Sequence, residues 1–236
     1  MSLPSEAKVV IIGGGVIGCS IAYHLAHLGW TDIVLLERKQ LTSGTTWHAA
    51  GLIGQMRATL NMTKLAKYSA ELYTGLEAET GVATGYKQYG SLGLALSPAR
   101  KEEMLRGMSM AKTFGLEAHW KTAQECLDMY PYLNTDGVEG GLFLPSDGQA
   151  DPANIAHALA KGAKQKGAKI VEGVKVTGVT THNGRASGVT YDQDGEQGTI
   201  TAPYVVNAAG MWGREVGSMA GVNVPLQACE HFYILT

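Results

Sequence analysis

The first forty residues contain the feature that most constrains the fold of this chain. Lys8–Ile12 is a short, mostly β-branched run, which predicts a strand buried on both faces. It leads directly into the glycine pattern GGGVIG of residues 13–18, and apolar residues at helical spacing follow over Cys19–Leu28. Ile33–Leu36 predicts a second strand that ends at Glu37. A strand, a GxGxxG turn, a helix, and a strand ending in an acid together predict a dinucleotide-binding βαβ unit.

Each part of this unit has a physical role. Gly13 permits a tight turn, Gly15 lets a diphosphate approach the backbone, and Gly18 lets the helix pack close to the strand. The amino terminus of the helix supplies free N–H groups and the positive end of the helix dipole. Glu37 can accept hydrogen bonds from the ribose hydroxyls, and its charge disfavours the 2′-phosphate of NADP. A bare tight turn is the alternative reading of the glycines, and FAD and NAD both remain open at this point.

The segment after the second strand is unusual for an NAD-binding fold. Thr42–Gly54 is rich in Gly, Ser, Thr and Ala, so it can run along an extended cofactor and offer hydroxyl and backbone donors. Trp47 and His48 lie side by side in its middle. Bound FAD would place its flavin beyond the ribose, where His48 either reaches the benzenoid edge or only packs beside the ring. Trp47 is expected to shape the loop by packing.

The second half of the chain predicts the rest of a Rossmann-like sheet. A helix from Asp151 to about Lys166 leads into a strand, and a β-rich crossover follows, with strands expected at 174–181, 186–191 and 199–202. Tyr204–Ala208 is another buried strand, and it ends in the small residues Ala209 and Gly210. Small residues at the carboxyl end of a strand let a cofactor approach the backbone, which favours FAD over NAD. Trp212 either lies near the flavin or the substrate or simply packs.

The region between these halves predicts several helices but identifies no substrate. Helical spacing predicts one helix over 60–79 and a second from Ser97-Pro98 to about Gly115. Thr122 begins a capping box, which predicts the start of a third, short helix. A methionine stripe at helical spacing indicates core filling. The fold class is α/β, a Rossmann-like FAD-binding domain with a β-rich crossover.

Composition narrows the class of protein. With 236 residues, 45% of them hydrophobic, the chain can bury a large core, and a net charge of −2 gives no reason to expect nucleic acid. The apolar run before Gly13 is too short to span a membrane. Cys19, Cys126 and Cys229 have no metal-ligand spacing, so no metal site is predicted. Sparse, odd cysteines favour free thiols and a cytoplasmic location.

Five stretches carry a resemblance to a known family. They are VVIIGGGVIGCSIAYHLAHLG, LLERKQLTSGTTWHAAGLIG, DGQADP, YVVNAAGMWGREVG and EHFYILT, in this order along essentially the whole chain. The chain resembles the FAD-dependent amine oxidoreductases of the D-amino-acid oxidase superfamily, and especially the dimethylglycine dehydrogenase and sarcosine dehydrogenase family. The resemblance implies that His48 carries the flavin covalently on its 8α-methyl group. It also implies that the backbone of Val176 reads the adenine, although Val176 is equally an inward strand residue.

The resemblance implies a reaction as well. An N-methyl amine such as dimethylglycine or sarcosine would lose a hydride to flavin N5, and water would hydrolyse the resulting iminium to formaldehyde. His231 takes the family position of an active-site histidine, or is a strand histidine satisfied by backbone partners. The resemblance favours a dehydrogenase over an oxidase and leaves the electron acceptor open. It also implies that more substrate-binding strands follow Thr236, and that a folate domain could lie only there.

The resemblance implies a division into domains too. It adds the start of an α+β substrate domain to the Rossmann-like FAD-binding domain with its β-rich crossover. The implied parts are 1–85 and 146–223 for FAD, 86–145 for substrate, and 224–236 for further substrate-domain strands.

Two alternatives remain open from the sequence. One is another amine, amino-acid or glycerol-3-phosphate oxidoreductase of the same superfamily, and the other is a non-catalytic FAD-binding fragment. The residues expected to contact FAD are Gly13, Gly15, Val16, Ile17, Gly18, Glu37, Arg38, Gly44, Thr45, Thr46, Trp47, His48, Ala49, Ala50, Gly51, Leu52, Val176, Gly210 and Trp212.

Overall fold

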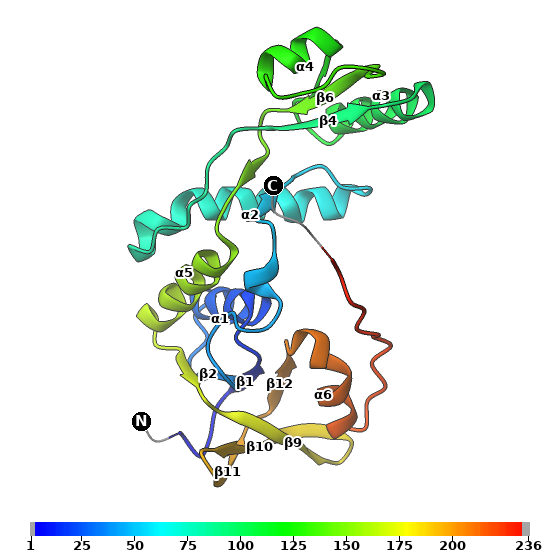
Figure 1. The fold of residues 1–236 in the computed structure, drawn as a ribbon. Coiled ribbons are helices and arrows are strands. Elements are labelled where there is room, and N and C mark those ends of the chain that lie inside the picture. The colour runs from blue at the N-terminus through cyan, green and yellow to red at the C-terminus, as the bar shows by residue number, and fades with distance from the viewer. Residues whose placement is uncertain (1–2, 233–236) are drawn as a thin grey trace. The chain divides into compact units, whose positions relative to one another are not determined.

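The computed structural model describes residues 3–232 and divides into two compact units (Figure 1). The first unit comprises Met1–Ala49, Leu76–Ala83 and Pro152–Thr236, and the second comprises Ala50–Gly75 and Thr84–Asp151. Residues 50–75, which the sequence assigned to the first part of the FAD-binding domain, thus belong to the second unit. Each unit is described by itself.

The first unit is built on a parallel four-stranded sheet in the order β12-β1-β2-β8. These strands are Tyr204–Asn207, Val9–Ile12, Ile33–Glu37 and Lys169–Glu172. All four residues of β1 and the first four of β2 are buried, because both faces of the central strands are covered. Strand β1 pairs with β2 on one side and with β12 on the other, so the Rossmann-like parallel arrangement expected from the sequence is confirmed.

Helices α1 (Val16–His27) and α5 (Pro152–Gln165) pack side by side in this unit (Figure 1). By the spacing of the apolar residues over Cys19–Leu28, Ile21, Leu25 and Leu28 would share one face of α1, but Leu28 is 76% exposed. The buried face instead carries mostly small residues, namely Gly18, Cys19, Ala22, Tyr23 and Ala26. Small side chains let the helix approach the sheet closely, which the glycine turn between β1 and α1 requires.

The β-rich crossover forms a separate antiparallel sheet in the order β11-β10-β9. Its strands are Lys175–His182 (β9), Arg185–Gln193 (β10) and Glu196–Thr201 (β11), which confirms the expected three-stranded unit. The β9–β10 turn places Asn183 at φ 50° and Gly184 at φ 74°, a left-handed pair that suits a two-residue hairpin. Val189 and Ile200 of this sheet are fully buried in one core with Val10 of β1. After β12 come the 3₁₀ turn η2 (Gly210–Trp212) and helix α6 (Gly213–Met219).

The second unit contains an antiparallel sheet in the order β4-β6-β5, formed by Ser91–Ala95, Gly140–Leu144 and His119–Lys121. Its other elements are β3 (Leu52–Ile53), α2 (Leu60–Thr80, whose last five residues belong to the first unit), α3 (Pro98–Thr113), α4 (Ala123–Met129) and β7 (Gly148–Gln149). The capping box at the start of α4 is present as expected, with Thr122 and Glu125 bonded to each other's backbone N–H groups. Met104 lies in the core of this unit, so the interpretation of the methionines as core filling is confirmed for that residue.

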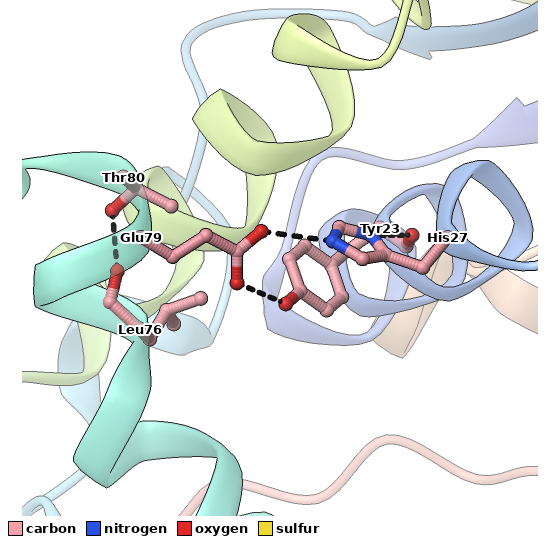
Figure 2. A network of polar contacts seen from close by, with 5 residues as sticks. All are labelled: Tyr23, His27, Leu76, Glu79 and Thr80. Carbon is pink, nitrogen blue, oxygen red and sulfur yellow. Dashed lines mark hydrogen bonds and ion pairs between the residues drawn. The ribbon is translucent and has the colours of Figure 1, made fainter.

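A polar network joins the end of α2 to α1 within the first unit (Figure 2). The hydroxyl of Tyr23 donates to Oε2 of Glu79 at 2.6 Å, and Nε2 of His27 lies 2.8 Å from Oε1. The Tyr23 and His27 rings stack with centroids 3.9 Å apart. Burial raises the pKa of the Glu79 carboxyl, but the hydrogen bonds from Tyr23 and His27 and the charges of His27 and Lys166 outweigh it, so this pKa lies below its ordinary value.

Replacing Glu79 by glutamine is expected to lower the melting temperature at pH 7, since an amide cannot accept from both neighbours. A loss of about 1 kcal/mol corresponds to a shift of about 2–4 °C for a chain of this size. Because its folded pKa is depressed, the carboxylate contributes stability above its ordinary value of 4.5, and this contribution is lost as the pH falls through the folded pKa. Thermal melts from pH 7 to pH 3 should therefore show a steeper acid loss for wild type than for Glu79→Gln.

Glu77 supplies the matched control for this prediction. It lies on the same helix, is exposed, and forms no ion pair among residues 3–232. Glu77→Gln should melt like wild type at every pH. Identical melts for the two variants would contradict the role of the network.

Candidate cofactor site

The turn between β1 and α1 is formed by backbone that leaves no room for side chains. Gly13 has φ 113°, and a Cβ added to it would lie 2.4 Å from the carbonyl oxygen of Ala208. A Cβ on Gly18 would lie 1.9 Å from the carbonyl oxygen of Gly13. A Cβ on Gly15 would lie 3.1 Å from Oγ1 of Thr46. Gly13 and Gly18 therefore meet the requirements of a tight turn and of close helix packing, while the approach of a diphosphate to Gly15 stays a prediction.

Glu37 holds the glycine turn in place. Its Oε2 accepts a hydrogen bond from the backbone N–H of Gly14 at 2.7 Å, and its Oε1 accepts from the N–H of Lys39 at 2.9 Å. Both carboxylate oxygens thus have one backbone donor and keep a second lone pair. The structure adds this anchoring role to the ribose contact that the sequence predicts for Glu37.

The Thr42–Gly54 segment returns to the amino terminus of α1. The hydroxyl of Thr46, which is buried, accepts from the N–H of Val16 at 3.0 Å. Gly15, the N-cap residue, has no side chain to do this, so Thr46 satisfies one of the free N–H groups at the helix start. The N–H of Thr42 donates to the carbonyl of Gly14 at 2.9 Å, which fixes the same loop against the turn.

A cavity of about 260 Å³ opens where these segments meet, at the carboxyl ends of β1, β2 and β12. This is the edge of an open parallel sheet at which cofactors bind. Its walls are formed by Ile12–Gly15, Leu36–Lys39, Ser43–Thr46, Val174–Val176, Ala208–Gly210, Trp212, Glu215, Val216 and Met219. Exposed backbone at the glycine turn, a carboxylate and cationic side chains together provide the groups that a dinucleotide requires, so the residues present fit FAD.

Roughly half of the expected contact residues line this cavity. They are Gly13, Gly15, Glu37, Arg38, Gly44, Thr45, Thr46, Val176, Gly210 and Trp212. The others do not line it: Val16, Ile17, Gly18, Trp47, His48 and Ala49 lie elsewhere in the first unit, and Ala50, Gly51 and Leu52 lie in the second. Gly18 acts on the turn by close packing instead. For these residues a contact with the cofactor stays a prediction.

Several residues of the cavity wall were not predicted. Lys39 and Lys175 follow or begin strands at this edge, and a placement at strand ends could have indicated them. Glu215 and Met219 come from α6, which follows the predicted Ala209–Gly210 strand end. The short helix carries no pattern that could have identified them.

Trp47 and His48 form a stacked pair in a 3₁₀ turn, η1 (Thr46–His48). Their ring centroids are 3.7 Å apart with an interplanar angle of 34°, and Trp47 is 56% exposed. No residue in 3–232 gives the exposed His48 ring a hydrogen bond. The indole thus lies against one face of the imidazole and leaves its ring nitrogens without a hydrogen bond among these residues.

His231 lies in an exposed stretch after α6 that has no regular secondary structure through Phe232. It does not line the cavity. Its assignment to the active site stays a prediction. Strands were expected over 224–236, but residues 224–232 form none, and residues 233–236 lie outside the described range.

Cys19 lies behind the glycine turn and is fully buried. Burial, followed by the negative charge of Glu37, raises the pKa of its thiol to about 12. The thiol stays protonated at neutral pH, which makes it a packing residue. Cys126 and Cys229 are also unpaired.

Together, the parallel sheet, the glycine turn, the acid at the end of β2 and the cavity at the strand ends define a dinucleotide-binding oxidoreductase fold. Residues 8–236 match the family model for DAO, FAD dependent oxidoreductase, and the chain belongs to this family. The family membership implies FAD as the cofactor, and the resemblance drawn from the sequence motifs is confirmed.

Two curated relatives and one solved structure describe the similarity. Human mitochondrial sarcosine dehydrogenase is 44% identical over 240 residues, and human mitochondrial dimethylglycine dehydrogenase is 42% identical over 231 residues. These matches cover 99% and 98% of this chain but only 26% of each relative. The crystal structure of L-proline dehydrogenase from P. horikoshii superimposes with a TM-score of 0.87 at 30% identity, over 93% of this chain and 57% of that one.

The chain therefore spans about a quarter of the length of the curated relatives it matches. Among residues 3–232, no helix is long and apolar enough to cross a membrane.

Proposed function

We propose that this chain supplies the FAD-binding part of an oxidoreductase that demethylates an N-methyl amine of the dimethylglycine or sarcosine type. The observation that carries the proposal is the match, along the whole chain, to two relatives named for these substrates. The complete glycine turn and the cavity beside it support a chain that binds its cofactor.

The residues of the cavity divide the work of holding FAD. Gly13 and Gly15 leave the backbone open to the diphosphate, and Glu37 accepts from the ribose with its remaining lone pairs. Lys39 and Lys175 would supply positive charge for the phosphates, while the guanidinium of Arg38 lies over the Trp212 ring. When bound, the flavin supplies the acceptor for the hydride of the N-methyl carbon.

His48 is proposed to carry the flavin covalently through one of its ring nitrogens. Its exposed imidazole has no competing hydrogen bond among the described residues, and Trp47 fixes the orientation of the ring. His231 is proposed to face the substrate, where a histidine can bias the amine toward its neutral, reactive form. A small-molecule electron acceptor or partner protein is proposed in place of oxygen, which makes the enzyme a dehydrogenase.

The location in the cell is also a proposal. Three unpaired cysteines fit a reducing compartment. The cytoplasm, as expected from the sequence, is one such compartment, although both human relatives are named as mitochondrial proteins.

Acid precipitation tests the covalent bond. The wild-type chain, expressed with FAD, is expected to keep its yellow colour in the pellet, and His48→Ala is expected to release it into the supernatant. His182→Ala, at an exposed hairpin position, should behave like wild type. Colour in the wild-type supernatant would leave His48 only a packing role.

Substrate reduction tests the function itself. The full-length protein, mixed anaerobically with sarcosine, dimethylglycine, D-alanine or glycerol 3-phosphate, should bleach its flavin only with the N-methyl amines. A redox dye should then restore the colour faster than oxygen does. Bleaching by D-alanine or glycerol 3-phosphate alone would replace the proposal with another activity of the superfamily, and no bleaching at all would indicate a non-catalytic FAD-binding protein.

A further inference from the structure

Arg38 and Trp212 both line the cofactor cavity and contact each other, although they are far apart in the sequence. Arg38 directly follows Glu37 of β2, whereas Trp212 ends the 3₁₀ turn after β12. The guanidinium carbon of Arg38 lies 3.8 Å from the centroid of the indole. Both residues line the cavity, so their contact connects two of its walls.

Trp212 also contacts a third segment. A Cβ added to Gly44 would lie 3.5 Å from Cζ3 of the indole, so the ring reaches the Ser43–Thr46 loop that lies over the start of α1. Three separate chain segments therefore close around one indole ring. An indole that contacts two other segments of the cavity wall is placed to narrow the space that a ligand as large as a dinucleotide must pass.

The contact between the Arg38 guanidinium and the Trp212 ring is weak enough to break and re-form. Arg38 forms no ion pair among residues 3–232 and is exposed, so the indole face is the partner that orients its guanidinium. A cation over an aromatic ring at an exposed site is a weak interaction. Lys39 and Lys175 line the cavity together with Glu37 and Glu215, so two cationic side chains stay available to an anionic ligand while the stack is closed.

Resting on the proposed cofactor role of the cavity, we propose that the Arg38–Trp212 stack is a reversible closure that controls how fast the adenine dinucleotide enters and leaves. Opening separates the indole from the guanidinium, and closing restores the contact over the bound ligand. A closure of this kind slows association and dissociation together, because a ligand passes only during the open fraction of time.

The experiment measures ADP binding to the full chain by stopped-flow fluorescence, because ADP has no flavin that could become attached to His48. If the stack is shut about nine tenths of the time, Trp212→Ala should raise both rate constants about tenfold and change Kd less than threefold. Arg38→Ala should raise both rate constants in the same way, since it removes the other half of the stack.

Lys8 and Trp30 supply the matched control. Lys8 Nζ lies 4.4 Å from the centroid of the Trp30 ring, a pair of the same kind that does not line the cavity. Lys8→Ala should leave both rate constants as in wild type. Thermal melts of all variants establish that each one folds. If Trp212→Ala does not fold, the rate constants of Arg38→Ala still decide the test.

Each remaining outcome overturns the proposal in a distinct way. Rate constants within twofold of wild type in a folded Trp212→Ala or Arg38→Ala protein would mean that the stack does not limit passage. A faster dissociation with unchanged association would mean that the pair is an ordinary contact of the bound ligand. No ADP binding by the wild-type chain would remove the cofactor role of the cavity and the closure with it, whereas the substrate reduction test judges the proposed reaction separately.

Discussion

Replacing Gly18 by alanine is expected to destabilise the first unit by about 3 kcal/mol or more. The added methyl group would lie 1.9 Å from the carbonyl oxygen of Gly13, which is backbone and cannot rotate away. Helix α1 would have to move off the sheet, and the turn that presents Gly13 and Gly15 to the cavity would move with it. Thermal unfolding followed by circular dichroism should show a melting temperature lower by about 6 °C or more.

Gly75→Ala is the matched control for this substitution. Gly75 lies in helix α2, is exposed, and a Cβ there would meet nothing within 4 Å. Alanine at this position should stabilise the protein by about 0.5–1 kcal/mol, because glycine is a poor helix former. Equal melting temperatures for Gly18→Ala and wild type would show that α1 does not need to lie so close to β1.

Replacing Glu37 by glutamine is expected to weaken ADP binding by about tenfold to a hundredfold. Both carboxylate oxygens accept backbone N–H groups, from Gly14 and from Lys39, and a glutamine has only one acceptor oxygen. Its amide nitrogen would face a donor, which costs about 1–3 kcal/mol and loosens the glycine turn. Isothermal titration with ADP measures the effect directly.

Glu172 provides a closely matched control for Glu37. It lies on β8 in register with Glu37 on β2, and a single backbone donor, the N–H of Leu41, bonds to its Oε1 at 2.6 Å. Glu172→Gln can keep this bond with its carbonyl oxygen, so ADP affinity should change less than about threefold. A similar loss in both variants would indicate that negative charge at this edge matters more than hydrogen bonding.

The sequence predicted the cofactor turn well because its requirements are local. Gly13 needs a positive φ of 113° and Gly18 packs against the Gly13 carbonyl, both within one βαβ unit, and Glu37 ends a strand whose pattern is unambiguous. The same locality explains the success with the β9–β10 hairpin and with the capping box of α4.

The failures have a common physical origin in tertiary packing. Leu28 fits the apolar face of α1 by spacing, yet close approach to the sheet selects small side chains such as Ala22 for the buried side. Glu215 reaches the cavity wall because α6 follows β12 closely, and no periodic pattern encodes that position. The second anchoring bond of Glu37, to Lys39, depends on how the chain turns after β2.

The pairing of β1 with β12 has a consequence for protein synthesis. Val9 pairs with Tyr204, so β1 waits for a partner strand that is encoded almost two hundred residues later. At about 5–20 residues per second, this wait lasts roughly 10–40 s. During that time the two-stranded pair of β1 and β2 has both edges open, because β1 still lacks β12 and β2 lacks β8, which is also made late. The nascent chain is therefore expected to need chaperone protection on the ribosome until Asn207 has emerged.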